Sequence, residues 1–461
     1  MKVAFVVHQY PPRFNTGTEI YAHRLALVLR KRGVDVRVFT HEPNVSNDIA
    51  LRVIDDPADE VPVTRLTAFE GLAPNHALRD YYDVFLGKVF GEWLDKVRPD
   101  AVHVFHLIGL GLSLVEECHA RGIPVFVQLM DFWFLCPTVQ LLRRNGTLCE
   151  GPDTPVCIEC LAPDNYGYQG LRMFSQRDGF VEVTAPDPSL TDVSHADLGL
   201  RRAALHGRPA FIRRVLGKAT ALVTPSHFLK SMFLRNGYDA ASMIHVPYGV
   251  DPPATAVRSV PVNGPGTVTF GFFGSVNPQK GLEVLISAFR EYRNDRFKLV
   301  VRGNMQHFPK YARRVRAFAN IDPRITFRGP YGHGELAAAL SSIDVLVVPS
   351  VWYENTPFVV LEAFSAGRPV IASDLGGLSE LVKDGLNGRT FRAGDPGALM
   401  NVLRDFDEDP TLLKRLAGGI GKVRTLEENA RDFVALWERE LAATGAARPG
   451  GSAVPAAGGR P

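Results

Sequence analysis

The sequence predicts an α/β protein built from two parallel-sheet domains, and three observations support this class. Short, continuously apolar runs alternate with helical patterns, as in residues 2–7, 18–32 and 34–39. Strands that are apolar throughout are typical of parallel sheets covered by helices on both faces. The alternation starts again at about residue 268, after a stretch rich in Pro, Gly, Val and Asn that resembles a linker. A chain of 461 residues is also long enough for two or three domains.

The first predicted domain spans residues 1–250. Between residues 138 and 210 the alternation stops and Pro, Gly, Asp and Arg become frequent, so we interpret this segment as a Cys-containing insertion on the first domain. The predicted strands of this domain are 2–7, 34–39, 101–105, 125–129 and 221–224, and its predicted helices are 18–32, 112–121 and 226–236.

The second predicted domain spans residues 254–424 and repeats the pattern of strands and helices. Each strand should end in a loop at the carboxyl edge of the sheet, where open α/β sheets bind ligands. Residues 444–461 are rich in Gly, Ala and Pro, and we expect a disordered tail there. The predicted strands are 268–273, 297–301, 325–328, 344–348 and 370–372, and the clearest helices are 282–292 and 358–366.

Composition and charge limit the classes of function. The formal net charge is only +3, whereas a nucleic-acid binder is expected to show a strong basic excess, so we expect no nucleic-acid partner. No signal-peptide pattern and no run of about 18 apolar residues is present, so no membrane span is expected. The five cysteines are typical of a reducing cytosol. These features predict a cytoplasmic protein, and basic pairs such as Arg213–Arg214 would allow peripheral contact with the inner membrane face.

The loop after the predicted strand 268–273 has the composition of a phosphate-binding turn. It begins with Gly274 and Ser275, and Lys280 and Gly281 precede a predicted helix. Glycines let a backbone approach phosphate, while helix amides and a lysine supply positive potential. The alternative is a plain turn between a strand and a helix.

Two further loops follow strand ends in this domain. Arg302 and Gly303 end one strand, and an arginine in that place suits a phosphate group. Arg328 ends the next strand, and Tyr331 in its loop could flank a nucleotide base. Ordinary strand-end charges are the alternative interpretation for both loops.

The stretch from Glu354 to Glu362 is the most informative part of the sequence. Asn355, Thr356 and Pro357 lead into a predicted helix whose free amides could hold a diphosphate. Glu362 lies about 7 Å along that helix, whereas Glu354 comes before its start. Carboxylates accept hydroxyl hydrogen bonds, so the pair could hold both ends of a nucleotide sugar. The alternative is a glutamate favoured by the helix dipole together with a solvated Glu362.

These motifs resemble glycosyltransferase family 4, the group 1 transferases of the GT-B fold. The likeness rests on YPPRFNTGTEIYAHRLALVLRKRGVDV, GFFGSVNPQKGLEVLISAF and PSVWYENTPFVVLEAFSAGRPVIASDLGG, and it covers the chain to about residue 440. The resemblance implies two Rossmann-like domains facing a cleft, the second binding a nucleotide-sugar donor and the first an acceptor. It also implies that a last helix, about residues 425–442, packs back on the first domain. Catalysis in this family requires no metal ion or other cofactor.

Carried over by position, the resemblance assigns donor contacts to residues of the second domain. Lys280 would contact the diphosphate, Glu362 would hold the ribose hydroxyls, and Glu354 would hold the transferred sugar. The amides of Asn355 and Thr356 would lie near that sugar.

The phosphate contacts depart from the family pattern at one position. Gly17, in the first loop, would pass close to the donor phosphate or the acceptor. The family usually has an arginine where this chain has Ser275, and Arg302 is a candidate to replace that arginine.

The first domain departs from the family pattern at two positions. The family places an active-site histidine after a strand, and here the register leaves either Phe105 or His106, of which we select His106 as catalytic. The alternative is that His103 and His106 are sheet-end residues with satisfied hydrogen bonds. In the His-Asp pair that the family has after the next strand, Asp131 is kept but the histidine is Met130.

Four of the five cysteines lie close together in the predicted insertion. Cys136, Cys149, Cys157 and Cys160 include one C-x2-C pair, so they could form a structural zinc site or an iron–sulfur centre. Free or redox-active thiols are the alternative. A bound metal would stabilise a segment whose apolar content is low.

The predicted function is therefore that of a retaining glycosyltransferase using a nucleotide-diphosphate sugar. Its acceptor would be a glycan, lipid-linked or other hydroxyl group, in cell-surface polysaccharide or glycoconjugate biosynthesis. The alternative is a catalytically weakened transferase-fold protein that binds nucleotide sugars or acts as a scaffold, which the departures at Phe105, Met130 and Ser275 would favour.

Overall fold

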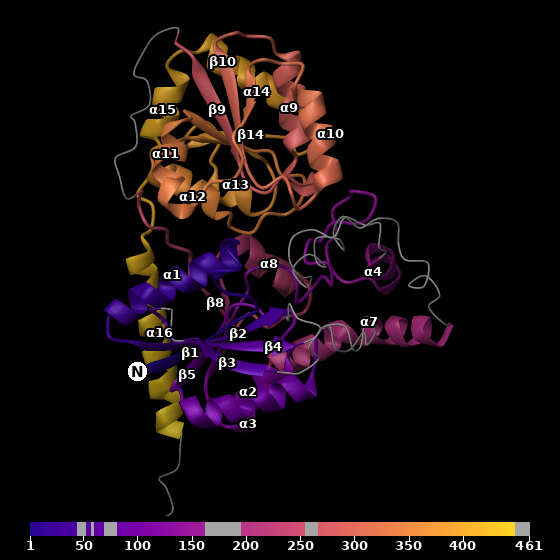
Figure 1. Ribbon diagram of the computed structural model, residues 1–461, viewed down its shortest axis with the longest axis vertical. Coiled ribbons are helices and arrows are strands. Elements are labelled where there is room, and N and C mark those ends of the chain that lie inside the picture. Colours follow the sequence, from indigo (N-terminus) through magenta and orange to yellow (C-terminus); the bar gives the residue numbers. More distant parts are fainter. Residues whose placement is uncertain (44–51, 57–59, 69–80, 162–194, 254–265, 448–461) are drawn as a thin grey trace, which may run out of the picture.

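The predicted α/β class with two parallel-sheet domains is confirmed. The computed structural model describes residues 1–43, 52–56, 60–68, 81–161, 195–253 and 266–447. An eight-stranded sheet and a six-stranded sheet form the cores of two domains, one above the other in Figure 1. In this part of the chain, no helix is both long and apolar enough to cross a membrane.

The first domain contains eight strands and several helices that precede or follow them along the chain. Its strands are β1 (Lys2–Val7), β2 (Asp35–Pro43), β3 (Arg52–Asp56), β4 (Val63–Ala68), β5 (Ala101–Val104), β6 (Val125–Gln128), β7 (Ala221–Thr224) and β8 (Met243–His245). Its helices are α1 (Gly17–Lys31), α2 (Val84–Val97), α3 (Ser113–Ala120), α4 (Thr154–Cys160), α7 (His195–Leu216) and α8 (His227–Arg235).

The first sheet has the strand order β3-β4-β2-β1-β5-β6-β7-β8. All its pairings are parallel except that of β3 with β4, which is antiparallel. The order reverses between β1 and β5, so the loops after these two strands diverge and leave a crevice at the carboxyl edge. Strand β3 was not predicted, because its sequence RVIDD is short and charged, as suits an edge strand.

The second domain repeats the alternation of strands and helices. Its strands are β9 (Val268–Phe273), β10 (Phe297–Arg302), β11 (Ile325–Phe327), β12 (Val345–Val348), β13 (Val370–Ser373) and β14 (Gly388–Phe391). Its helices are α9 (Leu282–Glu291), α10 (Pro309–Ala319), α11 (Leu336–Ser341), α12 (Phe358–Ser365), α13 (Gly377–Leu381), α14 (Pro396–Glu408) and α15 (Leu412–Gly418), with short 3-10 turns η2 (Pro278–Lys280) and η3 (His333–Glu335).

The second sheet is parallel throughout, with the order β11-β10-β9-β12-β13-β14. This is the doubly wound order of dinucleotide-binding folds, and it reverses between β9 and β12. The loops after β9 and β12 are the two that the sequence selected as phosphate and sugar loops. The topology therefore brings them to one crevice, although 75 residues separate their ends in the chain.

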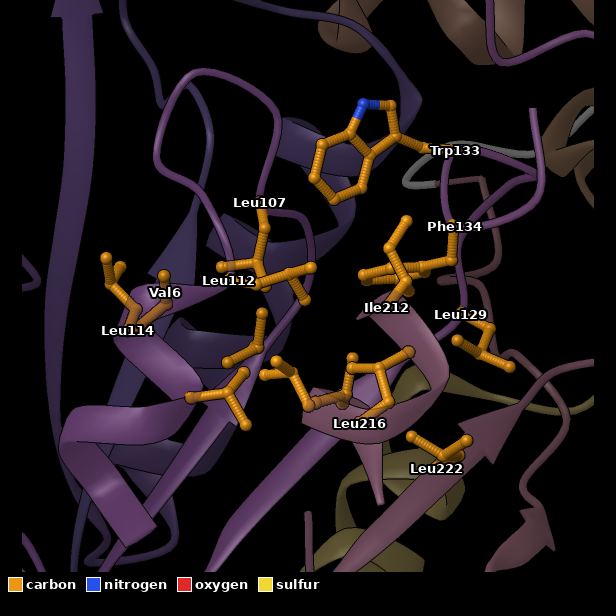
Figure 2. Packing of buried hydrophobic residues seen from close by; sticks show 14 of the residues in the cluster. Val6, Leu107, Leu112, Leu114, Leu129, Trp133, Phe134, Ile212, Leu216 and Leu222 are labelled. Carbon is orange, nitrogen blue, oxygen red and sulfur yellow. The ribbon is translucent and has the colours of Figure 1, made fainter. Parts of the chain in front are cut away.

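The hydrophobic core of the first domain packs against the loops after β5 and β6, which carry residues of the candidate site. Figure 2 shows Leu107 and Trp133 packed with Leu112, Leu129 and side chains of α7 in one apolar cluster. Each of these residues is 2% exposed or less. Burying a large apolar side chain contributes about 1.5–3 kcal/mol, so the loops after β5 and β6 are fixed by packing.

The last helix, α16 (Leu426–Ala447), runs alongside the first domain (Figure 1). Phe433 and Trp437 are fully buried against β1 and α1. The helix extends past residue 444, where the sequence analysis starts the tail, because alanine is the best helix former. The rest of that segment, 448–461, lies outside the described residues, as do residues 162–194 of the predicted insertion.

The chain crosses between the domains twice at neighbouring points. Val250 N donates to Arg424 O at 3.0 Å, so the outgoing and returning segments run side by side. A Cβ on Gly249 would lie 2.1 Å from Thr425 O, so only glycine permits this close approach. Asn429 at the start of α16 accepts from Tyr21 Oη at 2.6 Å and ties the crossing to α1.

Candidate functional site

A cavity of about 300 Å³ lies between the two domains. Its walls come from the start of α1, the crossing segment, the end of β9 and helix α12. A volume of this size is at the lower end for small-molecule sites. The lining residues used below are Gly17, Tyr21, Arg24, Gly274, Tyr331, Phe358 and Glu362.

The glycine loop after β9 is built by close backbone approaches. A Cβ on Gly303 would lie 1.8 Å from Gly274 O, and one on Gly281 would lie 1.9 Å from Pro349 O. Gly274 itself has φ of 151°, which disfavours other residues. The loops after β9, β10 and β12 are therefore in backbone contact, and larger side chains would push them apart.

Lys280 and Glu354 form an ion pair at this junction, with Nζ 2.7 Å from Oε1. The same oxygen accepts from Ser350 Oγ at 2.7 Å and from Trp352 Nε1 at 2.9 Å. Burial by itself would raise the pKa of Glu354, but Lys280 and these two donors outweigh it and lower the pKa below its usual value. The carboxylate is thus ionised and fixed in one orientation.

Glu362 has a different environment on the cavity wall. No described residue donates a hydrogen bond to its carboxylate, and the nearest positive charge is Arg24. Burial raises the pKa of Glu362, and Arg24 only partly opposes that effect. A half-buried carboxylate with free acceptor capacity is suited to a hydroxyl-bearing ligand.

Arg302 lies beside the cavity at the end of β10. Its guanidinium carbon is 6.0 Å from the centre of the Tyr331 ring, and its Nε is buried without a hydrogen-bond acceptor among the described groups. Arg302 is adjacent to the glycine loop, because Gly274 N donates to Arg302 O at 3.0 Å. Tyr331 also packs on Phe273 at 5.3 Å between ring centres.

Two helix N-termini point at the cavity region. Helix α1 begins at Gly17, where an added Cβ would be 3.4 Å from the Phe358 ring. Helix α12 begins at Phe358, and Pro357 is its N-cap with φ of −68°. The predicted helix 358–366 therefore begins where the sequence analysis expects it, with Pro357 directly before it. The positive ends of both helices still favour an anion between the domains.

Asn355 connects the two domains next to Glu354. Its Nδ2 donates to Met130 O at 3.0 Å, and its Oδ1 accepts from Ser226 Oγ at 2.6 Å. The amide side chain is therefore held from both directions by the first domain. The loop after β12 and the loop after β6 consequently lie together, and the neighbouring Thr356 is only 8% exposed.

His106 and Asp131 form a polar pair in the first domain, in which the His106 side chain is 4% exposed and the Asp131 side chain is 28% exposed. Its Nε2 lies 2.9 Å from Asp131 Oδ2, and its Nδ1 accepts from the backbone of Ile108 at 3.1 Å. This arrangement puts the ring proton on Nε2. Burial would raise the pKa of Asp131, but the contact with His106 lowers it below its usual value. Both nitrogens of His106 are thus engaged within the protein.

Sequence reasoning missed two residues of this network. His8, after β1, lies against His106 with ring centres 4.6 Å apart and ring planes tilted by 50°, and its Nε2 lies 3.2 Å from Glu19 Oε1. Glu19 is fully buried and also accepts from Thr16. Burial is the largest cause that lowers the pKa of His8. The signal was available, because His8 and His106 follow the two strands that flank the switch point.

The structure separates the three residues around β5. His103 is fully buried, with Nε2 3.1 Å from Gln128 Oε1 and Nδ1 accepting from Trp437. Burial lowers the pKa of His103 to about 4. Phe105 faces the core shared by α1 and α16, whereas His106 faces Asp131. His103 is therefore a structural histidine, and His106 is the imidazole nearer the site.

The four clustered cysteines stay in one neighbourhood as free thiols. Cys136 and Cys149 are 8% exposed, and Cys160 is 7% exposed. Burial raises the pKa of Cys157 to about 11, and the other three thiols contribute to that shift. The sulfur atoms do not form a close set of metal ligands in this structure. A bound metal at this cluster stays a prediction.

Comparison with known proteins agrees with the two-domain site. The family model described as "Glycosyl transferase 4-like domain" matches residues 16–152. The model described as "Glycosyl transferases group 1" matches residues 267–409. The fold and the site between its domains define a glycosyltransferase of the GT-B fold. Because the two matches together cover more than half of the chain, the chain belongs to the group 1 glycosyltransferases.

Several curated relatives align with part of the chain. A D-inositol 3-phosphate glycosyltransferase of Streptomyces coelicolor is 34% identical over 155 residues, which is 32% of this chain and 34% of the relative. The aligned region thus spans about a third of that relative's length. A lipopolysaccharide 1,2-N-acetylglucosaminetransferase of Salmonella typhimurium is 27% identical over 45% of this chain and 57% of its own.

Solved structures share the fold over nearly the whole chain. Sucrose-phosphate synthase from Thermosynechococcus elongatus has a TM-score of 0.65 and 18% identity, covering 96% of this chain and 99% of its own. Anabaena Alr3699/HepE, in complex with UDP and glucose, has a TM-score of 0.60 and 15% identity, covering 95% and 99%. At such identities the similarity shows the fold alone.

Proposed function

We propose that this glycosyltransferase retains anomeric configuration and moves a sugar from a nucleotide-diphosphate sugar to a hydroxyl acceptor. The acceptor would be a glycan or a lipid-linked chain, in the synthesis of a cell-surface polysaccharide or glycoconjugate. A cytoplasmic location with peripheral contact at the inner membrane face belongs to this proposal, because a lipid-linked acceptor would be met there.

One observation carries the proposal. Glu362 stands on the wall of the cavity without a hydrogen-bond donor among the described residues, while Glu354 is ionised against Lys280 at the neighbouring loop. The two carboxylates flank the N-terminus of α12. A nucleotide sugar has hydroxyls at both ends and an anion between them, which matches this order of acceptors and positive potential.

Each part of the donor then has a partner. Glu362 accepts from the ribose hydroxyls, and Tyr331 borders the base. Lys280 moves from Glu354 toward the diphosphate or bridges the two, and Arg302 supplies a second positive charge. Glu354 accepts from hydroxyls of the transferred sugar. The fixed dipoles and charges would stabilise the departing diphosphate with little reorganisation.

The transfer step would use front-face attack. The acceptor oxygen bonds to the anomeric carbon while the bond from that carbon to the diphosphate oxygen breaks. The acceptor proton passes to the departing diphosphate, so no enzyme base is needed for it. The protein contributes position and charge, and closure of the domains about the crossing at Gly249 would exclude water.

His106 and Asp131 belong to the acceptor side in this proposal. His106 donates through Nε2 to one oxygen of Asp131, which orients the carboxylate. The second oxygen of Asp131 accepts from the backbone of Trp133 at 2.8 Å. The remaining lone pairs of this half-exposed group could accept from a sugar hydroxyl. No metal ion is required for catalysis in this scheme.

A second candidate function is a nucleotide-sugar-binding or scaffolding protein with weak turnover. Phe105 is buried in the core. Met130 accepts from Asn355 through its backbone oxygen and from Tyr248 through its sulfur, so neither residue supplies a side-chain proton donor. The intact Lys280–Glu354 pair favours the enzyme, because a scaffold has no need of it.

A donor screen followed by a release assay tests the proposal. Nucleotide sugars are compared by thermal shift, since a bound donor raises stability with its affinity. The stabilising donor is then incubated with lipid-linked and polysaccharide acceptors, and nucleotide release and product anomer are measured. Release with a retained anomer supports the enzyme. Tight binding without acceptor-dependent release would favour the scaffold, and an inverted anomer would overturn retention.

A further inference from the structure

Two histidines of the first domain and one glutamate of the second converge outside the cavity. One side-chain ligand atom from each of His227, His245 and Glu380 lies within 4.8 Å of the other two. The two imidazole rings have centres 4.0 Å apart and are tilted by 42°. Within the described ranges, no other group of three or more His, Cys, Asp and Glu side chains meets this criterion.

The fold of the first domain brings the two histidines together. Strand β8 pairs in parallel with β7, and its register sets His245 opposite Thr224 at the end of β7. After β7 the chain turns through Pro225 and Ser226. Ser226 caps α8, because its Oγ accepts from Leu229 N at 3.2 Å. His227 is the first residue of α8, so it must lie beside the end of β8.

Glu380 reaches the histidines from α13 of the other domain (Figure 1). One of its oxygens accepts from His227 N at 3.0 Å and the other from Phe228 N at 2.8 Å. The carboxylate thus caps α8 from across the domain boundary, where the helix dipole favours a negative charge. Each oxygen accepts one of these bonds and keeps a lone pair for another ligand.

The histidine at the end of β8 is prepared for metal binding. Its Nε2 lies 3.3 Å from Pro225 O, and a carbonyl can only accept, so the ring proton sits on Nε2 and Nδ1 carries the lone pair. A ligating histidine commonly donates its other N–H to a backbone carbonyl in this way.

We propose that His227, His245 and Glu380 form a site for a divalent transition metal, best suited to Zn²⁺, that links the two domains. Two imidazoles and one carboxylate are an established ligand set for zinc. Ligands at about 2.0–2.1 Å from one tetrahedral ion lie about 3.3–3.4 Å apart, so the three ligand atoms, now within 4.8 Å of one another, would approach by at most about 1.5 Å on binding. A water molecule would complete the coordination.

A metal in this place would stabilise the arrangement of the domains. It would add ligand bonds to the contact that Glu380 already makes with α8, so separating the domains would require losing them. Binding to the joined state alone stabilises it by RT ln(1 + [L]/Kd). This inference goes beyond the transferase proposal, because neither donor nor acceptor takes part in it.

Titration of metal-free, full-length protein with Co²⁺ and with Zn²⁺ tests the site. Cobalt at nitrogen and oxygen ligands lacks the near-ultraviolet thiolate charge-transfer band that cobalt at Cys136, Cys149, Cys157 or Cys160 would show, so the two clusters are distinguishable. We expect one equivalent bound without that band. His245→Ala and Glu380→Gln should each weaken it at least about tenfold, the scale of a lost ligand or its close support.

The matched control is His119→Ala, which removes an exposed histidine from α3 and should leave the affinity unchanged. A cooperative thermal unfolding transition of each metal-free variant will establish that it is folded. If His245→Ala or Glu380→Gln is not folded, His227→Ala, which replaces an exposed histidine, takes its place. Zn²⁺ should raise the unfolding temperature of the parent protein by more than that of the variants, in which binding at the four-cysteine cluster is unchanged. Unchanged affinity in His227→Ala and His245→Ala would overturn the site, and unchanged affinity in Glu380→Gln would overturn the link between domains.

Discussion

Lys280 Nζ and Glu354 Oε1 lie 2.7 Å apart although 74 residues separate them in the chain. They meet because β9 and β12 are neighbours in the sheet and their following loops leave the same edge. Glu354 is 5% exposed, and its Oε1 also accepts hydrogen bonds from Ser350 and Trp352. These three donors hold the Glu354 carboxylate in one orientation, so the carboxylate can bind polar groups without further ordering.

Replacing Glu354 by Gln should lower sugar transfer by about 10²-fold, because the fixed negative charge next to the sugar is lost. Donor affinity should fall less, since Glu362 and the phosphate contacts remain. Steady-state rates and calorimetric donor binding, compared between the parent and Glu354→Gln, separate the two effects. A loss of kcat/KM that equals the loss of donor affinity, with kcat unchanged, would show that Glu354 acts in ground-state binding only.

The same pair should make stability depend on pH. The pKa of Glu354 is lowered in the folded protein, so its stabilisation is complete above the unfolded value of about 4.3 and is lost as pH falls through the lower folded value. Denaturant unfolding of the parent and of Glu354→Gln should therefore differ most near neutral pH. A difference that grew on acidification would contradict this assignment.

Glu362→Ala should weaken donor binding by about 2 kcal/mol, the scale of a lost hydrogen-bond pair to a charged group. This corresponds to about a 30-fold rise in Kd by calorimetry. Glu291→Ala, which removes an exposed glutamate at the end of α9, is the matched control. Affinity that is equal in the two variants would remove Glu362 from the donor site.

Glu362→Gln should increase the stability of the unliganded protein at neutral pH. The pKa of this carboxyl is raised by burial, so ionising it costs free energy in the folded state. That cost is absent below the unfolded pKa of about 4.3 and is complete above the raised folded pKa. An uncharged side chain of the same shape avoids the cost. At neutral pH the unfolding temperature of Glu362→Gln should be higher than that of the parent protein, and the difference should vanish in acid. A lower unfolding temperature of the variant at neutral pH would show that the charge has an essential partner.

Arg302→Gln should weaken binding of the nucleoside diphosphate about tenfold and leave the free nucleoside unaffected, because the guanidinium adjoins Tyr331 and the glycine loop. Adding Ser275→Arg to Arg302→Gln should restore part of the affinity, since Ser275 stands where the related enzymes usually have an arginine. Calorimetry with both ligands measures this. Equal loss for nucleoside and diphosphate would indicate a general disturbance of the pocket.

The four-cysteine cluster should carry about one equivalent of zinc or iron when the protein is purified without chelator. Cys157→Ser and Cys160→Ser should each lower that content and destabilise the protein, because a structural metal contributes directly to folding. Elemental analysis with thiol titration checks this. Four reactive thiols and no metal in freshly purified protein would instead identify free cysteines.

The fold class, and most residues of the proposed donor site, were predicted from local features of the sequence. Apolar runs of strand length located β1, β5, β6, β7 and β9 within a residue or two, because fully buried strands need apolar side chains on both faces. Glycine loops and the Glu354–Glu362 spacing located the donor loops, because turns and helix starts require particular residues. Matching to a family then supplied the roles.

Only the tertiary structure decided which distant groups meet. The sequence left Phe105 and His106 as alternatives, and packing resolved them by turning Phe105 into the α1–α16 core and His106 toward Asp131. The sequence places His8 and His106 after two strands, but only strand order brings their rings together, and only domain placement brings Glu380 to His245. Secondary structure is encoded over a few residues, whereas these pairings are fixed by register and packing across the whole chain.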